Sequence, residues 1–181
     1  MEKMIRIVDN TNKVFAYIAG TMLVLSVVLI MGEIVARSVF NSTIYITTEY
    51  TAYFMVAITF LGLAFTLKEK GHIRMVFLYK VFKGVKARMI LDIYSYVVGL
   101  AAFLIITIAT FQFFWDSLVS GTQSMQLTKT YLAIPQFILP LGSLLLTLQF
   151  IAEISKTVLR YRSGELEINE EEDQELQAAG H

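Results

Sequence analysis

Long uncharged stretches alternate with short polar segments along this chain. Four of these stretches are rich in apolar residues and cover residues 14–32, 50–67, 93–115 and 130–152, which are 19, 18, 23 and 23 residues long. A helix rises about 1.5 Å per residue, so roughly 18 to 20 apolar residues cross the hydrocarbon core of a bilayer, which is about 30 Å thick. Four such stretches in 181 residues favour membrane spans over buried helices of a soluble domain, because no charged amphipathic partner covers them in water.

We therefore predict an all-α integral membrane protein with four transmembrane helices, each somewhat longer than its uncharged stretch. The expected spans are residues 14–40, 47–67, 88–116 and 132–158. Local signals support these boundaries. The hydroxyls of Thr47 and Thr48 would cap the second helix, and Asp92 would stand at the positive N-terminus of the third. Pro135 fits the first turn of the fourth helix, and Pro140 would kink or loosen its early part.

Composition and charge add an orientation to this picture. The chain is 56% hydrophobic with a mean hydropathy of +0.61, above the apolar share of about 45–50% in soluble domains. Thirteen of the 15 basic residues lie before the first span, between the second and third, or after the fourth. Only Arg37 and Lys129 lie in the other connections. Because cytoplasmic loops carry the excess of Lys and Arg, we expect both termini in the cytoplasm.

Two polar segments complete the predicted organisation. Residues 75–87 place apolar side chains on one side of a helical wheel and the basic residues Lys80, Lys83 and Lys86 on the other. This pattern predicts a short cationic amphipathic helix that lies in the membrane interface and faces lipid headgroups. Residues 163–181 are acidic and poor in apolar residues, which is typical of a disordered cytoplasmic tail. The four-helix membrane domain would then cover residues 1–162.

The residues that most enzymes and cofactor proteins need are missing from the sequence. The chain has no cysteine, and its two histidines, His72 and His181, lie outside the apolar stretches, so a haem held by paired histidines is unsupported. No HExxH, GxSxG or P-loop pattern occurs. We expect no enzyme activity, no catalytic, substrate-binding or metal-binding residue, no cofactor and no nucleic-acid partner.

Charged residues near the predicted outer ends of the first two spans are the main candidate functional groups. Glu33 and Arg37 are four residues apart on one helix face, and the turn to Glu49 is short enough to bring it within reach of them. Two interpretations stay open: an interfacial pair in contact with headgroups and water, or a polar contact to a partner subunit. At the inner end of the fourth span, Glu153 can meet Lys156 or Thr157, which is an ordinary arrangement at a membrane boundary.

Several short motifs are similar to those of a transporter family. Their positions are Arg37, Glu49, Phe60-Leu61-Gly62, Gly71-His72-Ile73-Arg74, Ile134-Pro135 and Pro140-Leu141-Gly142. Because of these motifs, residues 14–160 resemble the small, Q-type membrane subunit of tripartite ATP-independent periplasmic (TRAP) transporters. The family often continues its basic turn with Val-Asp, whereas this chain has Met75-Val76, so a role of that Asp is not carried over. The residues expected at a subunit interface or in structural polar contacts are Glu33, Arg37, Glu49, His72, Arg74 and Asp92.

The resemblance implies a function in transport. A TRAP system uses a sodium gradient to take up an organic acid that a periplasmic binding protein delivers to a large membrane subunit. The small subunit would pack beside the large one in the bacterial inner membrane and enlarge its stationary scaffold, with membrane lipids as further neighbours. Sialic acid is favoured over C4-dicarboxylates as the substrate class. Two alternatives are a membrane anchor of a respiratory complex and a small membrane-embedded enzyme that acts on lipids.

Overall fold

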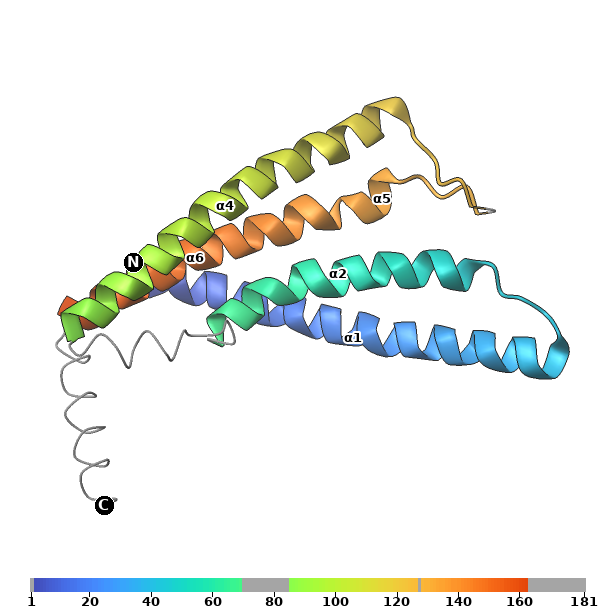
Figure 1. Ribbon diagram of the computed structural model, residues 1–181, viewed down its shortest axis with the longest axis horizontal. Coiled ribbons are helices and arrows are strands. Elements are labelled where there is room, and N and C mark those ends of the chain that lie inside the picture. Colours follow the sequence, from blue (N-terminus) through green and yellow to red (C-terminus); the bar gives the residue numbers. More distant parts are fainter. Residues whose placement is uncertain (1, 70–84, 127, 163–181) are drawn as a thin grey trace, which may run out of the picture.

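The computed structural model describes residues 2–69, 85–126 and 128–162. Within these residues the helices are α1 (Glu2–Phe40), α2 (Ile46–Lys68), α4 (Val85–Ser120), α5 (Ala133–Gln136) and α6 (Ile138–Arg162), as Figure 1 shows. No strand occurs in the described ranges, where an isolated bridge joins Gln123 and Tyr131. Four of the described helices are long and apolar enough to cross a membrane, which confirms the predicted all-α class with four spans.

Some helices begin earlier than the membrane boundary suggests, because a helix can continue into the polar region. α1 begins at Glu2 rather than near residue 14. α4 begins at Val85, so residues 85–87 belong to it and not to a separate interfacial helix. Asp92 therefore lies about two turns inside α4, and its predicted place at the helix N-terminus is wrong. The remainder of the expected interfacial helix and the acidic tail, residues 163–181, lie outside the described residues.

The start of α2 also differs from the prediction in one respect. The helix begins at Ile46, and Tyr45 at the capping position before it makes no side-chain capping bond. Thr47 and Thr48 already lie inside the first turn. The predicted hydroxyl caps are therefore wrong, whereas Glu49 does lie in the first turn, where its charge suits the helix dipole.

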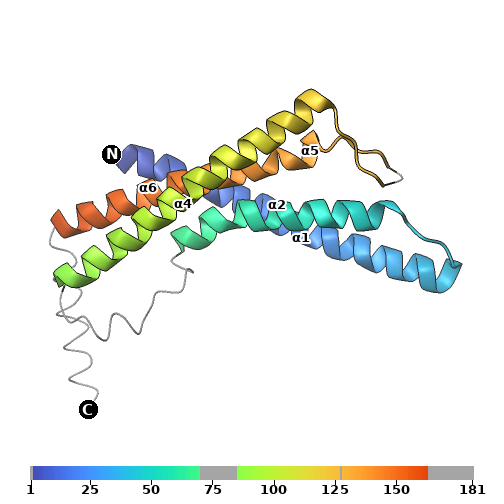
Figure 2. The ribbon, with the colours of Figure 1, turned by 45° about the horizontal axis from the view of Figure 1, so that its top comes forward.

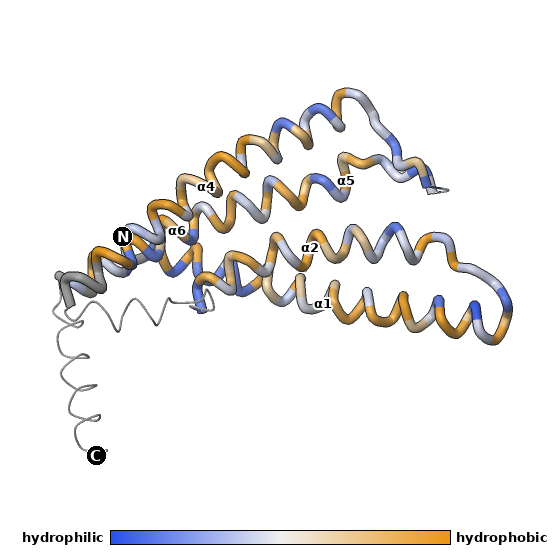
Figure 3. Tube along the Cα trace, in the orientation of Figure 1, coloured by the Kyte–Doolittle hydropathy of each residue, from blue (hydrophilic) through white to orange (hydrophobic). Residues whose placement is uncertain are grey.

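The long helices form two hairpins that converge at one end of the molecule. α1 and α2 make one hairpin, and α4 makes the other with α5 and α6; the pairs move apart toward the link between α4 and α5 (Figures 1 and 2). Helix α6 packs against α1, α2 and α4. Apolar residues predominate along all four long helices in Figure 3. In the most apolar 18-residue stretch of α6, 56% of the residues are buried, whereas the residues of that stretch in α4 are partly buried or exposed, so α6 is the internal helix.

Two close approaches hold α6 against its neighbours. The buried core is formed by small and aliphatic side chains and one ring: Ala19, Leu61, Ala64, Leu67, Leu145, Leu146 and Phe150. A Cβ added at Gly142 of α6 would lie 2.7 Å from the backbone of Phe60 on α2, so only glycine permits this approach. A Cβ added at Gly99 of α4 would lie 2.5 Å from the ring of Phe150. Gly142 and Phe60 belong to two of the motifs noted above, which therefore meet in the fold.

The interruption between α5 and α6 follows from Pro140. A proline has no N–H to donate to the carbonyl four residues earlier, here Gln136, and its ring crowds that carbonyl. α5 ends at Gln136 and α6 begins at Ile138, so Phe137 separates them. The predicted loosening of the early fourth span is confirmed. The helical direction continues across the break, because the Leu141 N–H donates to the Phe137 carbonyl at 3.3 Å.

Gly142→Ala is expected to destabilise the isolated protein by about 1–3 kcal/mol, because the new methyl group must push α2 away from α6. Gly62→Ala is the matched control, since nothing lies within 4 Å of a Cβ at that position. The control should leave stability unchanged or raise it by up to about 1 kcal/mol, because alanine favours helix. Thermal unfolding in detergent measures both variants. Equal stability of the two variants would contradict the close approach of Gly142 to Phe60.

Candidate functional site

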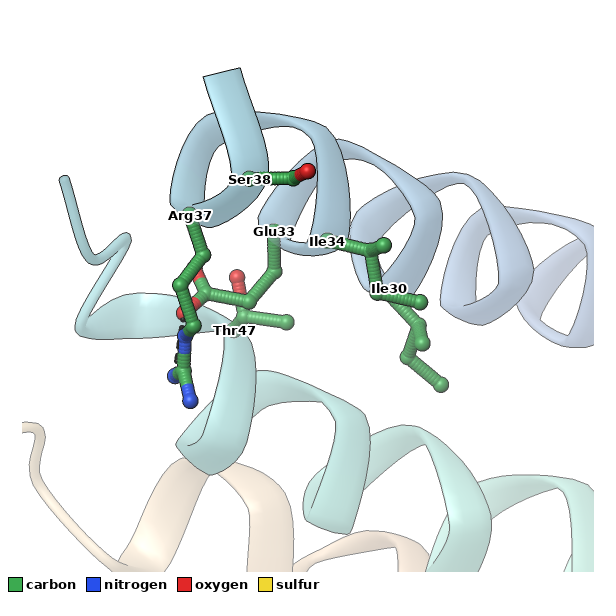
Figure 4. Close-up of a pocket in the computed structure, with 6 residues that line it drawn as sticks. All are labelled: Ile30, Glu33, Ile34, Arg37, Ser38 and Thr47. Carbon is green, nitrogen blue, oxygen red and sulfur yellow. Dashed lines mark hydrogen bonds and ion pairs between the residues drawn. The ribbon is translucent and has the colours of Figure 1, made fainter. Parts of the chain in front are cut away.

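Glu33 joins the end of α1 to the start of α2. Its Oε1 accepts a hydrogen bond from Arg37 Nη2 at 2.7 Å, and its Oε2 accepts one from the Ile44 N–H at 2.6 Å. Figure 4 shows both charged side chains extending from α1 toward α2 beside Thr47. The predicted pair of Glu33 and Arg37 is therefore formed. The bond to Ile44 means that Glu33 also fixes the link between the two helices.

Glu49 makes its hydrogen bonds elsewhere. It is buried, with 5% exposure, and accepts from the Tyr53 hydroxyl at 2.6 Å and from the Thr128 hydroxyl. Thr128 lies in the link between α4 and α5, so Glu49 connects the two hairpins at the end where they diverge. The predicted grouping of Glu49 with the Glu33–Arg37 pair is replaced by this contact, because the first turn of α2 directs the carboxylate toward the other hairpin.

Most of the other predicted residues lie outside the part of the chain that the structure describes. His72, Arg74, Lys80 and Lys83 fall outside the described residues. Lys86 falls in the first turn of α4, where the backbone alone is described. Asp92 is half-buried on α4.

A polar network at the opposite end of the bundle joins α1 to α6. Asn12 and Gln149 are fully buried, and Asn12 Nδ2 donates to Gln149 Oε1 at 2.5 Å. Gln149 Nε2 donates to Asp9 Oδ1 at 3.2 Å and to Glu153 Oε1 at 2.9 Å. The Lys156 ammonium then pairs with Asp9 at 2.9 Å and with Glu153 at 2.8 Å. We call these five residues the inner network.

Sequence reasoning found only one contact of the inner network. The pair of Glu153 and Lys156 was predicted from its spacing, and the alternative partner Thr157 instead donates to the Glu153 carbonyl at 2.9 Å. Asp9 and Asn12 precede the predicted first span, residues 14–40, although they lie inside α1. The available signal was an amide inside an apolar stretch: Gln149 must find hydrogen-bond partners where water is absent.

Hydroxyl groups make a second set of contacts between α4 and α6. The Thr107 and Thr147 hydroxyls lie 3.2 Å apart, as do those of Thr110 and Ser143. Each of the four also lies within hydrogen-bond distance of a backbone carbonyl of its own helix. Because a hydroxyl has one proton, in each pair one hydroxyl donates to its carbonyl and accepts from the other. Such contacts stabilise helix pairs in membranes by modest amounts. Together with the inner network, they describe a site suited to holding helices together.

No group of three or more metal-ligating side chains that could hold a metal ion occurs in the part of the chain that the structure describes. Comparisons with known proteins are more informative about function. The model of one protein family, described as "Tripartite ATP-independent periplasmic transporters, DctQ component", matches residues 26–160. A search of curated proteins found no match. The matched region contains the Glu33–Arg37 pair, Glu49 and the α6 part of the inner network.

Gln149→Leu is expected to destabilise the isolated protein by about 1–3 kcal/mol, because the buried amide of Asn12 loses its partner and two carboxylates each lose a donor. Gln112→Leu, at an exposed position of α4, is the matched control and should change stability little. Denaturant unfolding in detergent micelles measures both variants. The double variant Asn12→Leu/Gln149→Leu should lose less than the sum of the single variants, because it leaves no orphaned amide. Strict additivity would contradict the hydrogen bond between the two amides.

Proposed function

The chain belongs to the family of DctQ components of TRAP transporters, and from this premise we propose that it is the scaffold subunit of such a system. The family is a transporter component and not an enzyme. The match over residues 26–160 carries the proposal, because it includes parts of all four candidate spans. In this role the subunit holds the large transport subunit in place and itself binds no substrate.

The distribution of burial supports a neighbour for this chain within the membrane. In the most apolar 18-residue stretch of α1, 11% of the residues are buried, and in that of α4 no residue is more than partly buried. More than half of the residues are buried in that of α6. Helices α1 and α4 therefore present apolar surface along most of their lengths. Lipid can cover part of this surface, and we propose that the large membrane subunit covers the remainder.

The polar contacts of the chain also suit a stationary subunit. The inner network holds α1 against α6 at one end, and Glu49 joins the two hairpins at the other. The hydroxyl contacts between α4 and α6 lie between these ends. Contacts near both ends of the bundle and between them favour a subunit that keeps its shape while the large membrane subunit moves against it.

We place the chain in the bacterial inner membrane with both termini in the cytoplasm, on the distribution of basic residues in the sequence. The link between α4 and α5 and the link between α1 and α2 then face the periplasm, where the substrate-binding protein operates. Uptake would be driven by sodium, and the substrate would be an organic acid, with sialic acid favoured over C4-dicarboxylates. These points rest on the family's function and not on a substrate-binding residue identified in this chain.

Single cysteines introduced into this cysteine-free chain test the orientation. Cys replacements of Ser42 or Ser120 should react with a membrane-impermeant maleimide added outside intact cells. Cys replacements of Gly84 or Gly164 should react only after the membrane is opened. Labelling is read as a mass shift on a gel, with the unmodified cysteine-free protein as the control. Reactivity of Gly84 and Gly164 replacements from outside would reverse the proposed orientation.

Reconstitution tests the scaffold role. Liposomes that contain only this chain should take up neither labelled sialic acid nor a labelled C4-dicarboxylate under an inward sodium gradient. Uptake should require the large subunit, this chain and the binding protein together, and it should disappear when any one is omitted or when potassium replaces sodium. Uptake by this chain alone, or full uptake by the other two components without it, would contradict the proposed function.

A further inference from the structure

A shallow pocket lies where the end of α1 meets the start of α2. It is lined by Ile30, Glu33, Ile34, Arg37, Ser38 and Thr47 (Figure 4). The apolar residues Ile30 and Ile34 come first along α1, and Arg37 and Ser38 follow one to two turns later. Ile30 and Arg37 are seven residues apart, which is about 10 Å along the helix. The pocket therefore changes from apolar to charged along the direction that crosses the membrane.

The depth of the pocket fits the boundary between acyl chains and headgroups. Glu33 follows 19 uncharged residues that begin at Val14, which places it about 28 Å along the helix from the start of that stretch. A hydrocarbon core is about 30 Å thick, so Ile30 and Ile34 lie among acyl chains near its edge. Arg37 then reaches the level of the lipid phosphates.

Two groups in the pocket have capacity for a further partner. The Arg37 side chain is 66% exposed and donates to Glu33 through one of its five N–H groups. The Thr47 hydroxyl is buried and has no hydrogen-bond partner within the described structure. A ligand that offers acceptor oxygens would satisfy both, because a guanidinium binds phosphate strongly and a hydroxyl can donate to an ester or phosphate oxygen.

We propose that this pocket binds the headgroup of a zwitterionic phospholipid that carries a primary ammonium group, namely phosphatidylethanolamine. Its phosphate lies at Arg37, its ammonium lies at the Glu33 carboxylate, and one acyl chain lies along Ile30 and Ile34. The two charges of the pocket are the reason for the proposed preference for phosphatidylethanolamine over other phospholipids. An anionic headgroup gains Arg37 but meets the negative charge of Glu33, and a quaternary ammonium cannot donate a hydrogen bond to that carboxylate.

Native mass spectrometry of the full chain in detergent tests this site. The probes are phosphatidylethanolamine, phosphatidylglycerol and phosphatidylcholine with identical acyl chains, each added at the same concentrations. The wild-type protein should hold one phosphatidylethanolamine more tightly than either other lipid. Arg37→Gln should weaken this binding about tenfold through loss of a charge-assisted hydrogen bond. Glu33→Gln should abolish the preference over phosphatidylcholine while it keeps an acceptor for the Ile44 N–H.

Two further variants complete the design. Lys129→Gln is the matched control, because it removes an exposed basic residue from the link of the other hairpin at the same end of the bundle. It should bind phosphatidylethanolamine as the wild type does. Thr47→Val keeps the shape of the side chain and removes the unpaired hydroxyl, so it should weaken binding without loss of thermal stability. Equal binding of the three lipids by the wild type, or equal weakening by Lys129→Gln and Arg37→Gln, would overturn the proposal.

Co-purification of the Arg37→Gln variant with the large subunit, measured beside its lipid binding, separates a lipid from a protein occupant. The pocket could instead receive a carboxylate of the large subunit. In that case, Arg37→Gln would reduce co-purification with the large subunit and leave the lipid profile unchanged, and this result would overturn the lipid site. Loss of phosphatidylethanolamine binding from an otherwise stable Arg37→Gln protein supports it. The outcome does not depend on the proposed transport role, because binding is measured on this chain alone.

Discussion

Helix α6 must lie against three other helices at once, and the bundle depends on how closely it can approach them. Apolar side chains gain little from contact with one another inside a bilayer, since lipid tails are equally apolar. Helix association there relies on close fit and on polar contacts. α6 uses both. Gly142 permits backbone contact with α2, Phe150 fills the space above Gly99 of α4, and Gln149 bonds to α1. The positions of α1, α2 and α4 follow from these contacts.

Some polar groups of this chain are buried in contacts within the bundle, whereas others are exposed and can bind an external partner. Gln149, Asn12 and Glu49 are buried, and each has a partner on another segment of the chain. Arg37 is different, because most of its side chain is exposed although Glu33 holds one end of it. The sequence left a structural role and an external partner open for both Glu49 and Arg37. Their surroundings differ enough that we assign the first a structural contact and propose an external ligand for the second.

Local patterns predicted the parts of the structure that depend on local physics. Uncharged stretches of 18 to 23 residues located the spans, because the bilayer thickness sets a minimum length. Spacings of four and three residues predicted the pairs Glu33–Arg37 and Glu153–Lys156. Pro140 predicted the break before α6, because the cost of a proline inside a helix is intrinsic to the backbone.

Contacts between distant segments were not predictable in the same way. Asn12 and Gln149 are 137 residues apart in sequence, and Glu49 and Thr128 are 79 apart. A polar residue in a helix shows that some partner is needed, but the partner depends on which helix faces pack together. The early start of α1 has the same origin. Asp9 and Asn12 precede the uncharged stretch that located the first span, yet their bonds to α6 keep this part of the chain close to its neighbours.

The uninterrupted course of α1 has a mechanical consequence. One helix of 39 residues carries both Asp9 in the inner network and Glu33 at the pocket. The 24 residues between them correspond to about 36 Å of a stiff rod. If the rod pivoted about its inner end by about 10°, Glu33 would move sideways by about 6 Å, which follows from that length. A protein or lipid that holds one end of α1 therefore also limits the lateral position of the other end. A contact at one membrane surface is in this way transmitted to the other surface through one stiff helix.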